Sequence, residues 1–307
     1  MIPKPPPREG SLGFIYHPPY RVQGVSTAGE ATCVQIPELD LCFDMGLCPR
    51  AALASKFVAV SHGHMDHVGG LAYYCSQRRF QGMGDGTIVC STAIAGAIEK
   101  MMEGYVDLER QRTPYNLVAL PPEGEHEIKN NIVLRAFDVE HTAPTSGYAV
   151  VEKRSKLRPE YVGLPQEKLR ELKDRGIEIT HVLQIPLIAY LGDTLPGAHL
   201  VREDVRRAKI IITECTFFEP DHVARAKIGM HLHVNDVVEW LRVVESELLI
   251  IVHLSRRTNM HYARQRIEEL AGEELASRVA FLMDHRTNRA NYEKLARQVE
   301  EAANQGA

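Results

Sequence analysis

Three histidines and one aspartate fall within six positions of the chain, as His62, His64, Asp66 and His67. They follow the apolar run 57–60, which predicts a buried strand. On extended backbone His62 and His64 project to the same side, whereas Asp66 and His67 come after the chain begins to turn and can face the same point from another direction. Imidazoles and a carboxylate grouped in a tight bend are the ligands that zinc prefers. The segment therefore predicts half of a two-metal site rather than a set of solvated turn histidines.

Other side chains of the same chemical kinds stand at the ends of apolar segments. Five residues share this position: His62, His141, Asp193, Glu214 and His253. Groups at strand ends of an α/β sheet meet at one edge of the fold, where functional sites form. The pattern predicts that residues far apart in the chain converge there.

The elements that must position these groups follow from the spacing of apolar residues. Strands are expected at 31–36, 41–44, 57–60, 87–91, 131–137, 147–151, 184–190, 209–214, 248–252 and 279–283. Helices are expected at 71–79, 93–102, 166–175, 236–245, 262–270 and 291–303. The segment 152–183 begins with a basic run, continues through a loop rich in proline and glycine and contains a charged helix. We expect it to leave the core as an arm.

The composition is that of a soluble globular protein, and one α/β domain over residues 1–307 accounts for it. A net charge of −4 means that any nucleic-acid binding must depend on local basic patches. The six cysteines include no CxxC pair, which favours reduced buried thiols and a cytoplasmic protein. The first ten residues are rich in proline and lack the apolar stretch of a signal peptide, and no apolar run is long enough to cross a membrane.

Several segments resemble a known superfamily. The HxHxDH motif at 62–67, the isolated His141, the Gly-Asp-Thr at 192–194 and the late His253 are similar to the metallo-β-lactamase superfamily. Within it, the tRNase Z family in its short form is the nearest resemblance, and the likeness runs over most of the chain. It is carried by the segments 36–39, 42–46, 146–148, 156–164, 176–180, 213–216, 231–233 and 253–256.

The resemblance implies a four-layer αβ/βα sandwich of the metallo-β-lactamase type that holds two Zn²⁺ ions per chain, with Mn²⁺ or Fe²⁺ as alternatives. It implies these ligands: His62, His64 and His141 for one zinc, Asp66, His67 and His253 for the other, and Asp193 between them. It also implies that Asp66 orients or deprotonates the attacking water, that His231 protonates the leaving 3′ oxygen and that Glu214 orients His231.

The implied function is that of a zinc-dependent endoribonuclease that removes 3′ trailers from tRNA precursors by attack of a metal-activated hydroxide on a phosphodiester. The arm 152–183 would hold the tRNA body through the basic run of Lys153, Arg154, Lys156 and Arg158. Near the cut, RNA phosphates would contact Ser146, Arg256 and Arg257. A homodimer is implied by the resemblance, and no membrane partner is expected.

Two alternatives stay open on the sequence. The same fold could serve a hydrolase of a small phosphodiester, sulfate ester or lactone, because fold alone does not determine the substrate. A metal-free RNA-binding or scaffold protein is the other. A small-molecule hydrolase has no evident use for a basic arm, and the intact set of ligand types argues against the metal-free protein.

Overall fold

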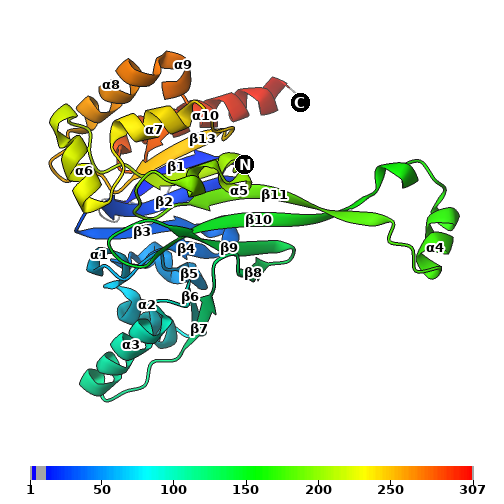
Figure 1. The fold of residues 1–307 in the computed structure, drawn as a ribbon, viewed down its shortest axis with the longest axis horizontal. Helices are drawn as coiled ribbons and strands as arrows, with labels where there is room; N and C mark the ends of the chain where they lie inside the picture. The colour runs from blue at the N-terminus through cyan, green and yellow to red at the C-terminus, as the bar shows by residue number, and fades with distance from the viewer. Residues whose placement is uncertain (1, 5–11, 306–307) are drawn as a thin grey trace.

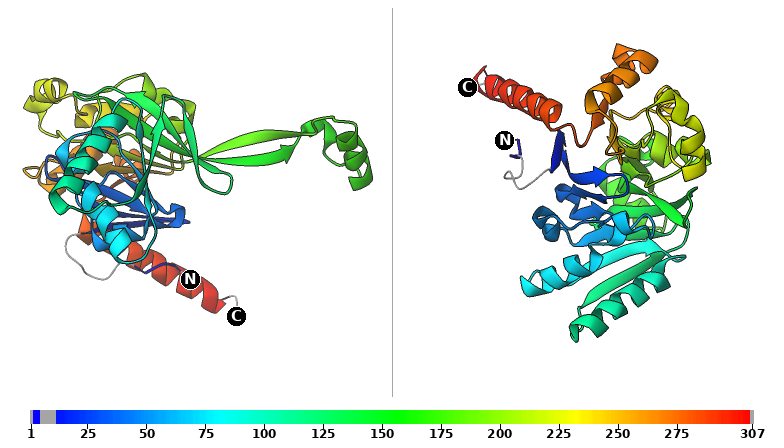
Figure 2. Two further views of the ribbon diagram at one scale, coloured as in Figure 1. Left: turned by 90° about the horizontal axis from the view of Figure 1, so that it is seen from below. Right: turned by 90° about the vertical axis from the view of Figure 1, so that its left-hand side faces the viewer.

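The computed structural model describes residues 2–4 and 12–305, and these residues form two seven-stranded sheets packed face to face with helices outside (Figure 1). Two further views show the helices between β5 (Phe57–Ala59) and β7 (Tyr115–Leu120) on one side of the paired sheets and the yellow and orange helices of the C-terminal half on the other, while the C-terminal helix lies beside the N-terminal strands (Figure 2). The resulting order of layers, helix–sheet–sheet–helix, confirms the predicted αβ/βα sandwich. Most of the proline-rich first ten residues, on which the expectation about a signal peptide depends, lie outside the described ranges.

The first sheet contains its strands in chain order. They are β1 (Gly13–His17), β2 (Tyr20–Thr27), β3 (Ala31–Ile36), β4 (Leu41–Phe43), β5 (Phe57–Ala59), β6 (Gly86–Ser91) and β7 (Tyr115–Leu120). The pairs from β1 to β4 are antiparallel, and those from β4 to β7 are parallel. The chain between β5 and β7 forms α1 (Met65–Val68), α2 (Leu71–Phe80) and α3 (Ala95–Glu109). The longer two supply the crossovers that parallel strands need, and they cover the outer face of the sheet.

The second sheet has the order β14-β13-β12-β11-β10-β9-β8. Its strands are β8 (Glu125–Lys129), β9 (Ile132–Val139), β10 (Thr145–Leu157), β11 (Thr180–Tyr190), β12 (Ile210–Glu214), β13 (Leu248–Val252) and β14 (Val279–Phe281). Its helices are α5 (Glu203–Arg206), α6 (Val223–Gly229), α7 (Val234–Leu241), α8 (Met260–Ala271) and α9 (Glu273–Ala276). The last helix, α10 (His285–Gln305), packs against β1 of the first sheet, where Tyr292 lies edge-on to Phe14. Strands β11 to β14 run parallel, so the carboxyl ends of these strands lie at one edge.

The core between the sheets is apolar and well filled. Phe43 of β4 stacks on Tyr190 of β11 with 4.6 Å between ring centroids, which joins the two sheets near the edge where the site lies. A second apolar layer separates the β8–β14 sheet from its helices, and Trp240 of α7 is anchored there by a 2.8 Å hydrogen bond to the Leu200 carbonyl. The strand ends are therefore held by packing on both faces of each sheet.

The arm is a long two-stranded ribbon. Strand β10 pairs with β9 only as far as Glu152, but its pairing with β11 continues to Leu157, opposite Thr180. The tip carries a short 3₁₀ turn (Pro159–Tyr161) and α4 (Gln166–Asp174), far from the body and at the opposite end of the molecule from α1 (Figure 1). The strands expected at 147–151 and 184–190 are thus too short, because the polar ribbon lacks the apolar alternation that marks a half-buried strand.

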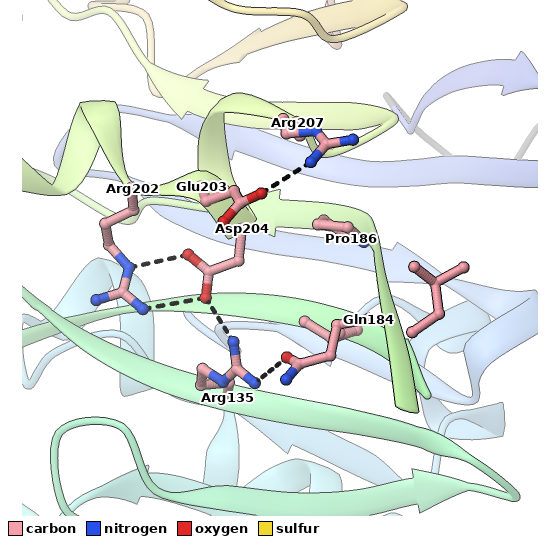
Figure 3. A pocket seen from close by; sticks show the side chains of 9 residues that line it. Arg135, Gln184, Pro186, Arg202, Glu203, Asp204 and Arg207 are labelled. Carbon is pink, nitrogen blue, oxygen red and sulfur yellow. Dashed lines mark hydrogen bonds and ion pairs between the residues drawn. The ribbon is translucent and has the colours of Figure 1, made fainter. Parts of the chain in front are cut away.

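A charged network ties the root of the arm to the body. Arg135 of β9 donates to Asp204 of α5 at 3.0 Å and to Gln184 of β11 at 2.6 Å (Figure 3). Arg202 also donates to Asp204, at 3.0 Å from both Nε and Nη2. These groups line a cavity of about 610 Å³ beside the arm root. Because these side chains bond to one another, we interpret the network as a structural connection, the joint, between the arm and the body.

Candidate metal centre and active site

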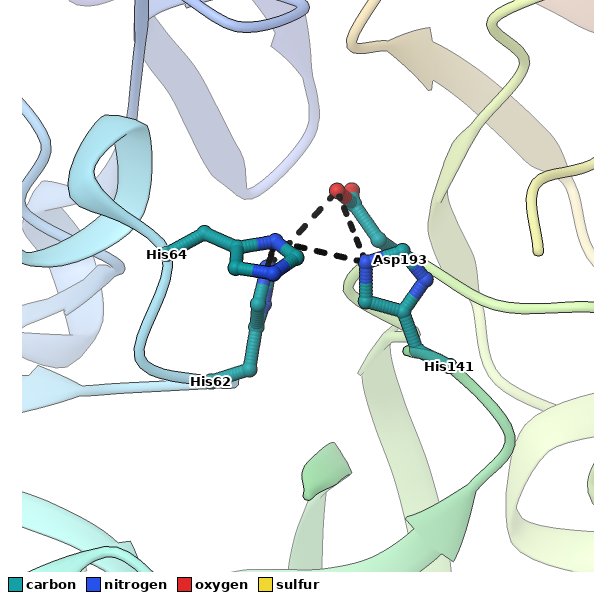
Figure 4. Close-up of side chains that lie close together, drawn as sticks. All are labelled: His62, His64, His141 and Asp193. Carbon is teal, nitrogen blue, oxygen red and sulfur yellow. Dashed lines mark hydrogen bonds and ion pairs between the residues drawn. The ribbon is translucent and has the colours of Figure 1, made fainter. Parts of the chain in front are cut away.

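Four side chains from three strand ends form a first cluster (Figure 4). Nδ1 of His64 lies 2.9 Å from Nε2 of His62 and 3.4 Å from Nε2 of His141. Asp193 Oδ2 lies 3.8 Å from Nε2 of His62 and 4.0 Å from Nε2 of His141. His62 follows β5, His141 follows β9 and Asp193 follows β11. One ligand atom from each lies within 4.8 Å of all the others, so these four could hold one metal ion.

A second cluster lies against the first. Asp66 Oδ2 lies 3.6 Å from Nε2 of His67 and 3.4 Å from Nε2 of His253, which follows β13. The same Oδ2 of Asp193 that faces the first cluster lies 3.4 Å from His67 Nε2 and 3.3 Å from His253 Nε2. Asp193 is therefore the side chain common to two groups of possible ligands.

The donor set fits metal ions. His67 is fully buried, and its Nε2 has no hydrogen-bond partner among the described residues. A buried polar atom without a partner destabilises the fold by about 1–3 kcal/mol. Coordination of a divalent cation between imidazoles and carboxylates would satisfy this nitrogen, and zinc takes such ligands.

The second ring nitrogen of each of four clustered histidines has a protein partner. The pairs are His62 Nδ1 with Ser61 Oγ at 3.0 Å, His67 Nδ1 with Asp44 Oδ2 at 2.8 Å, His141 Nδ1 with the Met230 carbonyl at 2.9 Å, and His253 Nδ1 with Thr216 Oγ1 at 3.0 Å. Such partners fix the ring orientation and leave the other nitrogen free for a metal.

Asp44 is a central support of the site. It is fully buried, in the left-handed backbone region with φ of 56°, and it accepts hydrogen bonds from the Ser61 amide at 2.7 Å and from Tyr190 Oη at 2.5 Å. The carboxylate of Asp44 also bonds to Nδ1 of His67 and so supports the ring from the side opposite Nε2.

The local electrostatics suit a metal site. Burial lowers the pKa of His62 to about 3, and the neighbouring His67 acts in the same direction. Burial alone would raise the pKa of Asp193, but the imidazoles of His253 and His67 outweigh it and hold the pKa well below its usual value. For His67, burial is outweighed by Asp44 and Asp193, which raise its pKa. A metal ion that binds His67 would therefore compete with a proton for the imidazole nitrogen.

Glu214 and His231 form a hydrogen-bonded pair beside the two clusters, and His231 also belongs to a third group of possible ligands, with Asp193 and His253. Glu214, at the end of β12, is buried, and its Oε1 accepts hydrogen bonds from His231 Nδ1 at 2.9 Å and from the Thr194 and Leu232 amides at 3.1 Å. Burial would lower the pKa of His231, but the hydrogen bond and charge of Glu214 raise it. The His231 ring lies 5.0 Å from that of His141. A histidine so held is suited to donate a proton at the edge of the metal clusters.

The residues expected to contact phosphate are more dispersed. Ser146 is buried at the start of β10, with its amide bonded to the Ser61 carbonyl at 2.9 Å. Arg256 and Arg257 are exposed after His253, and Arg256 pairs with Glu30 at 3.0 Å. Lys153, Arg154, Lys156 and Arg158 all lie on the arm, away from the clusters.

Two contacts of the site had not been expected. The Gly29 amide, in the turn between β2 and β3, donates to Asp66 Oδ2 at 2.8 Å. Thr216 Oγ1 lies 2.7 Å from Glu214 Oε2 as well as 3.0 Å from His253 Nδ1, so it links the Glu214–His231 pair to a candidate ligand. A backbone amide leaves no signal in the residue type. For Thr216, the only signal in the sequence is its position in a loop two residues after Glu214.

Comparison with known proteins finds curated relatives that carry one family name. The chain is 32% identical to tRNase Z TRZ1 of Arabidopsis thaliana over 241 residues, which cover 78% of this chain and 86% of that protein. It is also 32% identical to the chloroplastic tRNase Z TRZ2 of the same plant over 254 residues, 82% of this chain and 72% of that protein. Among solved structures, the short form of human tRNase Z has a similar fold, with a TM-score of 0.53 at 16% identity over 80% of this chain and 93% of that one. No protein-family model matches the chain.

Proposed function

The chain belongs to the tRNase Z family, and we propose on this premise that it is a metal-dependent endoribonuclease that removes 3′ trailers from tRNA precursors. The observation that carries this proposal is the position of Asp193 Oδ2, which lies between the His62–His141 side and the His67–His253 side of one site. Two metal positions joined by one carboxylate suit in-line displacement at a phosphodiester.

We propose two Zn²⁺ ions as the resident metals. Seven side chains would hold them: His62, His64 and His141 on one side, Asp66, His67 and His253 on the other, and Asp193 on both. When bound, such ions act as Lewis acids toward phosphoryl oxygens and lower the pKa of water. Neutral imidazoles with carboxylates are also compatible with Mn²⁺ or Fe²⁺, so metal analysis of purified protein is required to identify the ions.

The protein groups supply positioning and proton transfer. Asp66, whose Oδ2 also accepts the Gly29 amide hydrogen bond, would orient or deprotonate the attacking water. His231 would protonate the leaving 3′ oxygen through Nε2, because Nδ1 is occupied by Glu214. Glu214 would hold the imidazole in that tautomer and stabilise its protonated form. The products would be a 3′ hydroxyl on the tRNA and a 5′ phosphate on the trailer.

We propose that the arm contacts the tRNA body. Three of its four basic residues already pair with carboxylates: Lys153 with Glu125, Arg154 with Glu152 and Arg158 with Glu178. Lys156 is exposed and has no ion-pair partner among the described residues, so it is the cation most ready to meet a phosphate. Nearer the cut, Arg257 and Ser146 would contact phosphates. Arg256 would do so after it is released from its ion pair with Glu30.

Homodimer formation and a cytoplasmic location are further parts of the proposal. Tyr73 and Phe80 of α2 and Leu108 of α3 are large apolar side chains that are mostly exposed on the outer helices, where a second copy could cover them. The six cysteines are unpaired thiols, in keeping with a reducing compartment. None of the described helices has the length and apolar character of a membrane span. Sedimentation of the purified protein would measure its oligomeric state.

The decisive experiment incubates zinc-loaded protein with a tRNA precursor carrying a short 3′ trailer and maps both product ends. We expect one cut that leaves a 3′ hydroxyl on the tRNA body, abolished by chelation and restored by added zinc. Hydrolysis of a small phosphodiester, sulfate ester or lactone without precursor cleavage would replace this proposal by the small-molecule alternative.

A further inference from the structure

Two adjacent phenylalanines follow the Glu214 loop and differ in their surroundings. Phe218 is 1% exposed and packs in the core against Phe281, with 6.0 Å between ring centroids. Phe217 is only partly buried, and its ring lies 6.1 Å from that of His231 and 5.8 Å from that of His222. Its backbone is held by an isolated bridge to His233 and by a 2.9 Å hydrogen bond from the Val234 amide. Phe217 therefore forms part of the wall of the site beside His231.

A cation lies over this aromatic wall. The guanidinium of Arg225, on α6, lies 6.0 Å from the centroid of the Phe217 ring, and its Nη1 lies 3.1 Å from Nε2 of His222. Arg225 is exposed, and the described part of the chain contains no carboxylate within ion-pair distance of it. An aromatic ring next to an arginine without an acidic partner is a combination that binds nucleotides, because the ring stacks on a base while the guanidinium stacks or meets a phosphate.

The position beside His231 identifies which nucleotide is within reach. In the proposed reaction His231 protonates the 3′ oxygen that leaves, and this oxygen belongs to the nucleotide on the 5′ side of the cut. The base attached to that sugar is the one nearest to the ring that adjoins His231.

We propose that Phe217 and Arg225 form a stacking site for the base of the nucleotide whose 3′ oxygen is released. The inference rests on the proposed function and adds a substrate contact to it. Stacking accepts all four bases, because every base presents a π face. Such a site would position the last nucleotide of different tRNAs against the metals without selecting one base.

The test compares Phe217→Leu and wild type on two precursors that differ at one nucleotide. One precursor is unmodified, and the other is abasic at the nucleotide immediately before the cut. On the unmodified precursor we expect Phe217→Leu to lower kcat/KM roughly tenfold, the order of one lost stacking contact. The kcat/KM of wild type should fall by a similar factor when the unmodified precursor is replaced by the abasic one. For Phe217→Leu, the same change of substrate should lower kcat/KM by less than about twofold, because the stacking contact is already absent.

Two further variants guard against a merely structural effect. Phe217→Tyr keeps the ring and should restore most of the dependence on the base. Arg225→Gln changes an exposed side chain, so it should fold normally and still reduce the difference between the two precursors. Metal content and circular dichroism of each variant should match those of wild type.

The outcomes separate this inference from the proposed function. Suppose that wild type cleaves the precursor and that Phe217→Leu lowers kcat/KM by the same factor on the intact and the abasic substrate. The ring would then act by supporting His231, and the proposal of a stacking site would be wrong. An unchanged rate for Phe217→Leu on the intact precursor would also overturn it. If wild type does not cleave the precursor at all, the proposed function fails and the inference falls with it.

Discussion

Nδ1 of His231 donates a hydrogen bond to Oε1 of Glu214 at 2.9 Å, so Nε2 is the ring nitrogen that remains able to give a proton to a substrate. The carboxylate itself cannot rotate away, since the Thr216 amide and hydroxyl occupy its other oxygen at 3.1 Å and 2.7 Å. His231 also forms a third group of possible ligands with Asp193 and His253. We propose that proton delivery and metal binding are nevertheless separate, because Glu214 holds the imidazole of His231 through Nδ1.

The first prediction follows from that separation. Replacing His231 by Ala should lower kcat for precursor cleavage by roughly 10²–10⁴, the usual contribution of a positioned general acid. The zinc content, measured by atomic emission on the same preparation, should stay at the wild-type value. Glu214→Gln serves as the companion variant, because it keeps the shape but weakens the support of His231. Zinc loss from a normally folded His231→Ala protein would contradict the separate roles.

The second prediction concerns the carboxylate shared by both clusters. Asp193→Ala should abolish cleavage and reduce the affinity for both ions, because Oδ2 lies within 4.0 Å of ligand nitrogens on each side. Asp66→Ala should also lose activity but weaken chiefly the ion held by His67 and His253. Zinc titration monitored by calorimetry distinguishes the two variants. Asp221→Ala, which removes an exposed carboxylate, is the control and should bind metal as wild type does.

Much of this arrangement could be predicted because the strands that end at the site are short apolar runs. Strands β5, β12 and β13 lie in parallel parts of the sheets and are nearly all buried, so their sequences contrast sharply with the polar residues that follow. The order of apolar segments and the resemblance together therefore led to the correct sandwich, and the expected metal ligands, with Glu214 and His231, lie at the same edge.

The parts that could not be predicted depend on contacts between distant segments. Strand β8 is polar and exposed along most of its length, so nothing in its residue pattern distinguishes it from a loop. The contact of Asp44 with His67 joins residues that become neighbours only when β4 and β5 pair. The ribbon of the arm is stabilised by pairing between β10 and β11, which local periodicity cannot indicate.

The third prediction concerns the joint at the arm root. Burial alone would raise the pKa of Asp204, but hydrogen bonds from Arg202 and Arg135 outweigh it and hold the pKa below its usual value. Asp204→Asn should therefore lower the free energy of unfolding by about 1.5–3 kcal/mol at neutral pH, the range for hydrogen bonds to a charged group. Urea denaturation measures this difference, and Glu203→Gln, at an exposed neighbour that pairs with Arg207, should change it little.

The pH dependence of that difference has a definite sign. The folded-state pKa of Asp204 is lower than the unfolded value of about 3.9, so the ionised carboxylate stabilises the fold above about pH 4. The stabilisation is lost as the pH falls from there through the folded-state pKa. The gap between wild type and Asp204→Asn should therefore close in acid. A gap of constant size down to the lowest pH at which both proteins fold would show that the charge of Asp204 is not its cause.

The last prediction tests the arm and uses its ion pairs as internal controls. Replacing Lys153, Arg154, Lys156 and Arg158 together by Ala should weaken precursor binding and make it less sensitive to salt, because fewer phosphate contacts release fewer counterions. Since three of the four already pair with carboxylates, most of this effect should come from Lys156. Lys156→Ala alone should reduce the slope of log Kd against log salt by roughly one. Lys153→Ala, which removes the partner of Glu125, is the matched control and should change the slope less.

Hydrolysis of a small phosphodiester completes the comparison, because that substrate reaches the metals but not the arm. Its rate should be nearly unchanged in all these variants, and the ratio of the two activities in one preparation cancels differences in metal loading. An equal fall in both activities would mean that the basic run matters for folding. If neither activity changes, the arm does not bind the precursor, and the small-molecule alternative gains support.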